Sequence, residues 1–148
     1  MKVDLLPFYG LRKPLSRFLL ISLAVFAYSV AWLHAQGVTM PRRGGNPVAA
    51  KVMNPVPSSE VSIDAGRKIY RQHCPRCHGP EGRGDGGGAG AGGQPADFTD
   101  AEWEFGGSDG EIYAAIAQGT SADMEAYGER IAATEIWNLV NYLRTLKH

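Results

Sequence analysis

The chain has 148 residues, with 15 basic and 15 acidic side chains. This length suits one small domain with an additional segment, because a single core typically serves roughly 100 to 150 residues. Residues 1–35 carry four Lys or Arg and one acid, whereas the remainder carries eleven basic and fourteen acidic side chains. Nucleic-acid binding needs a coherent basic face, so this balance argues against that class of partner.

The N-terminal segment has the pattern of an export signal. Residues 18–33 carry no charge, and they follow the basic residues Lys2, Arg12, Lys13 and Arg17. A positive flank before an apolar run stays inside, and the following chain is delivered outside the cytoplasmic membrane. Small residues would allow cleavage after Ala31 or Ala35. The uncharged stretch extends toward Met40 and can reach the ~20 residues of a membrane span. Residues 1–35 are therefore predicted to be a signal peptide or an anchor, with the anchor preferred, and the protein is predicted to lie on the periplasmic side of a bacterial cytoplasmic membrane.

Residues 36–57 are predicted to form an extended tether. Four prolines and the Gly44-Gly45 pair interrupt this segment, and it has no hydrophobic period. A single domain is then expected over residues 58–148.

Three helices are predicted within this domain. The first follows Ser59 or Ser62 as a candidate cap and runs into Cys74, because its apolar residues have helical spacing. The second begins at the capping box of residues 108–111 and stops at Gly119. The third covers about residues 134–146. No strand pattern is present, so the class is all-α with long loops, and its few apolar side chains predict a buried prosthetic group that completes the core.

The sequence Cys74-Pro75-Arg76-Cys77-His78 is the strongest chemical signal in the chain. Both thiols can add to the vinyl groups of one haem while His78 meets the iron, and this spacing is typical of c-type haem attachment. A thioredoxin-like redox pair would require a βαβ setting, and a zinc site would require a second ligand pair; neither context is present. The motif therefore predicts one covalent haem c.

The segment from about Ser58 to Lys147 resembles a class I cytochrome c domain of the small bacterial periplasmic type. The resemblance rests on Gly66, Tyr70, Cys74–Gly79, Pro95–Thr99, Ser108–Tyr113 and Glu135–Arg144. It implies three to five helices wrapped around one covalent haem. It also implies that the first and last helices cross closely, with Gly66 facing Leu139 and Tyr142.

Met124 is the expected second axial ligand of the iron. Of the four Met residues, the other three lie before the expected domain, and Met124 lies among polar neighbours where a packing role is unfavourable. Many relatives have Pro after this Met, and here Glu125 follows. The weaker rivals are His34, His73 and His148.

The resemblance also suggests two residues around the haem. The carbonyl of Pro95, or another carbonyl of the Gly-rich loop, is expected to accept the second N–H of His78. Trp103 is expected either to donate to a haem propionate or to pack as a core aromatic.

These features favour an electron-transfer protein over an enzyme, since a six-coordinate iron has no open position for a substrate. The leading interpretation is a one-electron carrier in a respiratory or photosynthetic chain. The alternatives are a membrane-tethered subunit of a larger oxidoreductase complex and a haem-based ligand sensor or peroxidase. Ten acids against one Arg between Asp97 and Glu135 predict redox partners with a basic docking surface.

Overall fold

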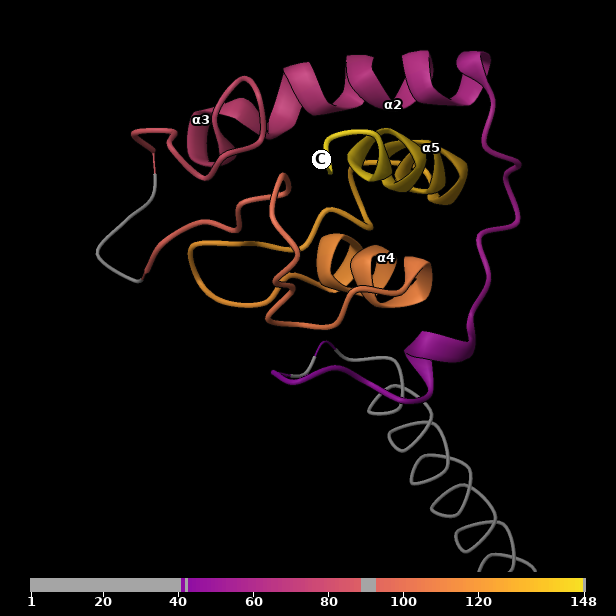
Figure 1. The fold of residues 1–148 in the computed structure, drawn as a ribbon, viewed down its shortest axis with the longest axis horizontal. Helices are drawn as coiled ribbons and strands as arrows, with labels where there is room; N and C mark the ends of the chain where they lie inside the picture. The colour runs from indigo at the N-terminus through magenta and orange to yellow at the C-terminus, as the bar shows by residue number, and fades with distance from the viewer. Residues whose placement is uncertain (1–40, 42, 89–92, 148) are drawn as a thin grey trace, which may run out of the picture. The chain divides into compact units, whose positions relative to one another are not determined.

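The computed structural model describes residues 41, 43–88 and 93–147. The regular elements of this part are the 3-10 helix η1 (Ala49–Lys51) and the α-helices α2 (Glu60–His73), α3 (Pro75–His78), α4 (Asp109–Gln118) and α5 (Ala133–Arg144), without any strand (Figure 1). The all-α class is confirmed. The predicted leader lies outside the described residues, and within them no helix has the length and apolar character that crossing a membrane requires.

Helix α2 begins where the sequence predicts. Ser59 is its N-cap, and the Ser62 N–H donates to the Ser59 hydroxyl at 3.2 Å while the Ser59 N–H donates to the Ser62 hydroxyl at 3.0 Å. The two candidate caps therefore act together as a reciprocal pair, which satisfies N–H groups that the first turn leaves without helical partners. Helix α4 has the expected capping box between Ser108 and Glu111.

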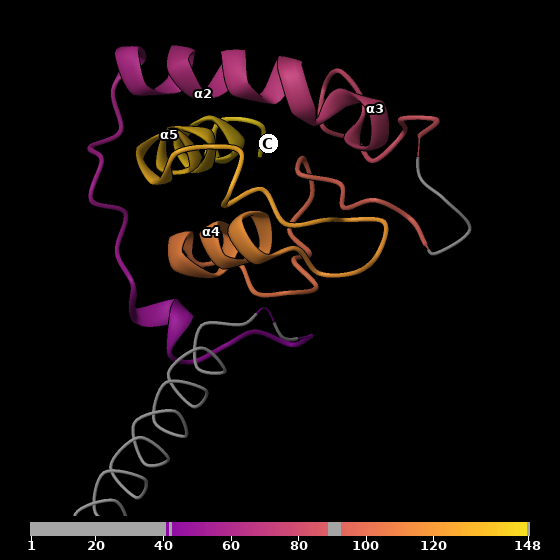
Figure 2. The same cartoon turned by 180° about the vertical axis from the view of Figure 1, so that it is seen from behind.

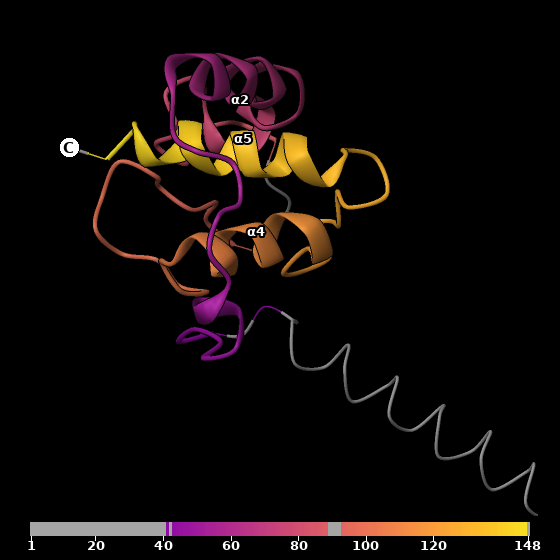
Figure 3. The ribbon, with the colours of Figure 1, turned by 90° about the vertical axis from the view of Figure 1, so that its right-hand side faces the viewer.

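Helix α5 lies between α2 and α4 in all three views (Figures 1, 2 and 3). Helix α2 runs across the view in Figure 1, where α5 is seen nearly end-on, and the reverse holds in Figure 3, so the two axes cross steeply. The side chains of α5 supply most of the core, and the buried hydrophobic cluster consists of Tyr70, Ile112, Ile116, Ile131, Ile136, Trp137, Leu139, Val140, Tyr142 and Leu143.

The helix crossing is close because Gly66 lies at the contact. A Cβ atom at Gly66 would lie 2.8 Å from the Cβ atom of Tyr142 and closer still to the carbonyl oxygen of Asn138. The expected contact of Gly66 with Tyr142 is therefore present. The other near neighbour of Gly66 is the backbone of Asn138, whereas Leu139 was expected there.

Residues 43–57, called the strap below, pack against the helices. The Asn46 N–H donates to the buried carboxylate of Glu111 at 2.8 Å. A Cβ atom at Gly110 would lie 2.7 Å from the carbonyl oxygen of Val52, so α4 and the strap approach closely. In Figures 1 and 2 the strap runs from the start of α2 past α5 to α4. The expected domain boundaries stay a prediction, but this described part of the expected tether is not free of the helices.

The second half of the strap is held by an amide pair. Asn54 donates to the Asn141 side chain at 2.9 Å and to the carbonyl of Trp137 at 3.2 Å. Asn141 in turn donates to the carbonyl of Val56 and to the Ser62 hydroxyl, both at 3.1 Å. Because buried amides are costly without partners, this network favours one position of the strap on α5.

We expect Gly66→Ala to lower the free energy of unfolding by about 1–3 kcal/mol or more, because the added methyl group meets backbone that cannot rotate away. Urea unfolding measures the change. Gly87→Ala is the matched control, since a Cβ atom there has no neighbour within 4 Å. Equal effects of the two substitutions would contradict the close crossing.

The Glu111 carboxylate makes the stability of the strap dependent on pH. Burial raises the pKa of Glu111, but hydrogen bonds from Ser108 and Asn46 lower it more, so the net pKa lies below its ordinary 4.5. A group of this kind stabilises the fold above the ordinary pKa, and its contribution disappears as the pH falls through the folded pKa.

We therefore expect Glu111→Gln to cost about 1–2 kcal/mol of unfolding free energy at pH 7. The difference from the unchanged protein should shrink as the pH falls below 4.5, because both proteins then carry a neutral group. Urea midpoints measured at steps between these conditions test this, with the exposed Glu129→Gln as control. A difference that is independent of pH would contradict the assignment.

Candidate haem-binding site

A cavity of ~940 Å³ opens between α2, α3, α4, α5 and the loops that follow α3 and α4. Its volume lies near the upper end of the roughly 300–1,000 Å³ typical of ligand pockets. The cavity is lined by all six residues that the sequence singled out: Cys74, Cys77, His78, Pro95, Trp103 and Met124. The fold therefore brings together groups that lie up to fifty positions apart in the chain.

The end of α2 places both cysteines and His78 on the same turn. Cys74 is the C-cap of α2, and Pro75 begins α3, where its missing N–H costs no helical hydrogen bond. The N–H groups of Cys77 and His78 both donate to the carbonyl of Cys74, at 3.2 and 3.0 Å. Both thiols and the imidazole therefore reach one cavity from one side.

The thiol of Cys74 is unsuited to a thioredoxin-like role. Burial, with a further contribution from the neighbouring Cys77, raises the pKa of Cys74 to about 12. Catalytic redox pairs depend on a thiol whose pKa is lowered. The environment of Cys74 therefore argues against the redox-pair alternative and is compatible with a thiol that becomes covalently capped.

His78 is held with one ring nitrogen available. Its Nδ1 lies 3.0 Å from the carbonyl oxygen of Ala96, which can only accept, so Nδ1 carries the proton. The ring also stacks on Phe98, with 4.5 Å between ring centroids. Burial lowers the pKa of His78, and the Ala96 hydrogen bond partly opposes this. A neutral imidazole with Nε2 unprotonated is the form that binds a metal.

The expected partner Pro95 is corrected to Ala96. The carbonyl of Pro95 lies against Gly84, where an added Cβ atom would collide with it. Gly84 is itself held by donating its N–H to the carbonyl of His78 at 2.9 Å. The Pro95 carbonyl is thus directed at the backbone, and the next carbonyl along the chain accepts from the imidazole.

Met124 reaches the cavity from the loop between α4 and α5. The Thr120 N–H donates to the Met124 carbonyl at 2.9 Å, and the Met124 N–H donates to the Ser121 hydroxyl at 3.1 Å. Gly119, with a φ of 72°, allows the sharp exit from α4 that this turn requires. These bonds order the loop although no Pro follows Met124.

Trp103 provides an observation that fits a haem. Its buried Nε1–H has no hydrogen-bond acceptor among the described residues, although it lines the cavity. A buried donor without an acceptor is costly, and haem carboxylates are acceptors. Together with two thiols, an imidazole and a thioether around one cavity, this donor set fits a covalent haem c.

Two neighbours of the site, Tyr70 and Phe98, belong to the segments that carry the resemblance, but the sequence assigned neither of them a role. Tyr70 donates its hydroxyl to the carbonyl of Gly79 at 2.6 Å and so holds the residue after His78. Phe98 stacks on His78 at a spacing that no local pattern encodes. Among the rival histidines, His73 also lines the cavity, whereas His34 and His148 lie outside the described residues.

The comparison with protein families supplies the decisive finding. Residues 61–143 match the family described as cytochrome C oxidase, cbb3-type, subunit III. The chain belongs to this family. The cytochrome c resemblance is thereby confirmed, and the cofactor is a covalently bound haem c.

A curated relative and two solved structures are similar to this chain. The cbb3-type cytochrome c oxidase subunit FixP of Azorhizobium caulinodans is 31% identical over 90 residues, which are 61% of this chain and 29% of the relative. A chain of the Kuenenia stuttgartiensis reducing HAO-like protein complex is 31% identical with a TM-score of 0.59, covering 67% of this chain and 49% of that one. Cytochrome CL of Methylophaga aminisulfidivorans, at 19% identity and a TM-score of 0.51, covers 69% of this chain and 59% of that one and shows the fold alone.

The matched relatives are longer than the segment they share with this chain. The chain spans less than a third of the curated relative and about half of the first solved structure. Membership therefore establishes a haem c domain of the electron-transfer type, and the role of the whole protein belongs to the proposal that follows.

Proposed function

We propose that this chain is a one-electron carrier domain whose haem c is attached through Cys74 and Cys77 and ligated by His78 and Met124. The observation that carries the proposal is the single cavity lined by all four side chains. When bound, haem c supplies a one-electron ferric and ferrous couple. His78 and Met124, approaching from separate segments, would fill both axial positions and leave none for a substrate.

The surrounding residues hold this arrangement. The carbonyl of Ala96 orients the imidazole, since it keeps the proton on Nδ1 and directs Nε2 into the cavity. The soft sulfur of Met124 would favour the ferrous state and raise the reduction potential. The apolar side chains Ile112, Ile116, Leu139 and Leu143 give the cavity apolar surface on which a porphyrin can pack.

We further propose that the domain works at the periplasmic face of a cytoplasmic membrane, with residues 1–35 as leader or anchor, residues 36–57 as the connection and residues 58–148 as the haem domain. The name of the FixP relative describes an oxidase subunit. This supports a second candidate function, in which the chain is a tethered haem subunit that passes electrons within a larger membrane complex. Isolation of the native protein from detergent-solubilised membranes distinguishes a free carrier from a subunit.

Expression with a c-type maturation system tests the haem proposal. We expect haem staining that survives a denaturing gel, loss of that stain in a Cys74→Ala, Cys77→Ala variant, and no binding of CO to the reduced protein. Absence of covalent haem, where a control cytochrome matures, would overturn the proposal. Prompt CO binding by the unchanged protein would instead favour the sensor or peroxidase alternative.

We expect Met124→Ala to open the sixth coordination position of the iron, so that the reduced protein binds CO. The reduction potential should fall by more than ~0.1 V, because axial ligands set haem potentials over a range of roughly 0.8 V. Optical titration measures both changes. Met53→Ala is the matched control, because Met53 is 84% exposed. A Met124→Ala variant that keeps the Met-to-iron charge-transfer band would exclude Met124 as the ligand.

Electron exchange with a basic partner should depend on salt. Four exposed carboxylates line the cavity: Asp100, Glu102, Glu104 and Asp123. We expect stopped-flow association with a lysine-rich redox protein to slow by about tenfold between low and high ionic strength. The double variant Asp100→Asn, Asp123→Asn should reduce this dependence, whereas Glu60→Gln, which lies outside the cavity lining, should preserve it. A rate that is indifferent to salt would contradict acidic docking.

A further inference from the structure

The strap brings a cation to the wall of the haem cavity. Of the described residues that line the cavity, Arg43 is the one Lys or Arg, and the carboxylates of Asp100, Glu102, Glu104 and Asp123 line it as well. Residue 43 precedes the segment 61–143 that matches the family. Arg43 therefore lies outside the part of the chain that matches the family.

Three contacts determine where Arg43 lies. The Gly44 N–H donates to the carbonyl of Glu104 at 2.8 Å, and the Asn46 N–H donates to Glu111 at 2.8 Å. Between them, Gly45 has a φ of 94°, and a Cβ atom there would lie 2.7 Å from Oε1 of Glu111. The strap is thus attached on both sides of Gly45, a position that only glycine suits. Arg43 immediately precedes the attached Gly44, so these contacts determine where Arg43 lies.

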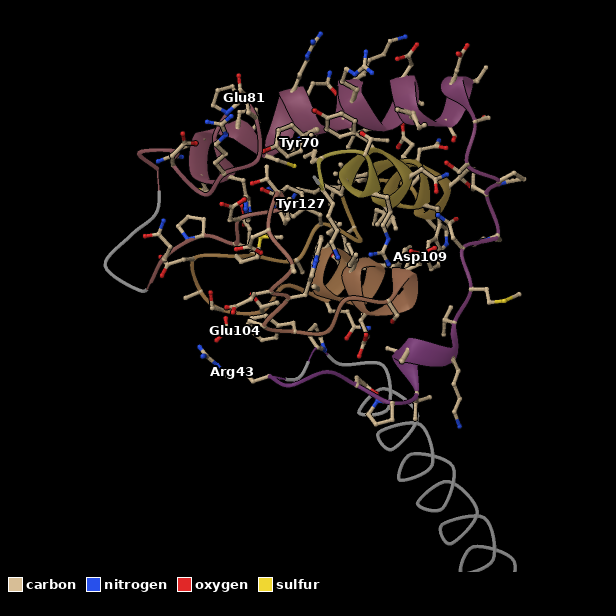
Figure 4. The ribbon with its side chains drawn as sticks, viewed as in Figure 1. Arg43, Tyr70, Glu81, Glu104, Asp109 and Tyr127 are labelled. Carbon is tan, nitrogen blue, oxygen red and sulfur yellow. The ribbon has the colours of Figure 1, made fainter. Side chains whose placement is uncertain are left out.

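The present partners of Arg43 hold it loosely. Its guanidinium pairs with Glu104 and lies 5.8 Å from the ring centroid of Phe105. The side chains of Arg43 and Glu104 are 78% and 54% exposed, and an exposed ion pair of this kind contributes little to stability. Figure 4 shows the two side chains directed toward one another at the edge of the domain. Arg43 can therefore leave Glu104 and pair with another carboxylate at little cost in free energy.

Haem c carries two propionate carboxylates, which need hydrogen-bond donors or a cation when they leave water. Apart from Arg43 and the histidines, the ionisable Asp, Glu, Lys and Arg side chains among the described lining residues are all carboxylates. Two of the described lining residues are suited to bind a propionate, Trp103 through its unpaired Nε1–H and Arg43 as the one Lys or Arg. We propose that Arg43, carried by the strap, binds a propionate of the haem and thereby raises its reduction potential. The proposal rests on the haem site proposed above and adds a residue to it from outside the matched domain.

The potential of the mature holoprotein tests this contact. Removal of a positive charge near the haem favours the ferric state, so Arg43→Gln should shift the ferric to ferrous ratio by about three- to tenfold at a fixed potential, where tenfold corresponds to 59 mV for one electron. Arg43→Lys should retain most of the potential. Lys51→Gln, which removes an exposed cation of the same strap, should leave it unchanged. Equal potentials of Arg43→Gln and the unchanged protein would overturn the proposal.

A second pair of variants separates a propionate contact from a merely structural role. In a Glu104→Gln background Arg43→Gln should still lower the potential, because the propionate remains its partner. If the effect vanishes there, Arg43 acts only through Glu104 and the proposal fails. Gly45→Ala should also lower the potential while Arg43 is retained, because it displaces the strap; an unchanged potential would show that the strap does not deliver this charge.

Haem staining and the Met-to-iron band, recorded on each variant, keep the two proposals apart. Loss of covalent haem in the unchanged protein would contradict the proposed function. Covalent haem with a normal band, together with potentials that do not respond to Arg43, would contradict only the role of Arg43.

Discussion

The close crossing of α2 and α5 at Gly66 is the contact on which the rest of the domain depends. Since Gly66 has no side chain, the backbone of α2 approaches that of α5 at Asn138. One turn further along, Tyr70 is then fully buried, with its ring centroid 5.4 Å from that of Tyr142. Its hydroxyl holds the carbonyl of Gly79. The helix that makes the crossing therefore also positions the chain immediately after His78.

Separate segments of the chain around this crossing present the different groups that line the cavity. The end of α2 and the short α3 present Cys74, Cys77 and His78 together, and a loop far along the chain presents Met124. The carbonyl of Ala96, from a third segment, orients the imidazole. As proposed, His78 and Met124 would supply both axial donors, and such an arrangement suits transfer of electrons. The proposed function thus depends on how three segments of the chain, the α2–α3 junction and two loops, meet beside one helix crossing.

The strap extends the domain beyond the segment that defines the family. Its attachment is polar, through the Asn54 and Asn141 amides at one end and the Glu111 carboxylate at the other. Buried polar groups specify one arrangement more strictly than apolar contacts do, because each misplacement leaves a group without its partner. A segment held in this way can present a charge at a defined place, which is the basis of the inferred role of Arg43.

The sequence by itself determined the helix class, the haem attachment and the approximate helix limits, because these depend on local signals: the spacing of Cys74, Cys77 and His78, the serine caps, and the apolar period of the last helix. It also selected Met124 and Trp103, and both residues line the cavity. Only the tertiary structure decided which carbonyl accepts from His78, since Pro95 and Ala96 differ by one position and the choice depends on the approach of Gly84. Only the tertiary structure attached residues 43–57 to α4 and α5, because prolines and glycines describe an irregular backbone equally well whether it is free or packed. The long-range contacts of Asn46 with Glu111 and of Asn54 with Asn141 carry that information, and no local pattern contains them.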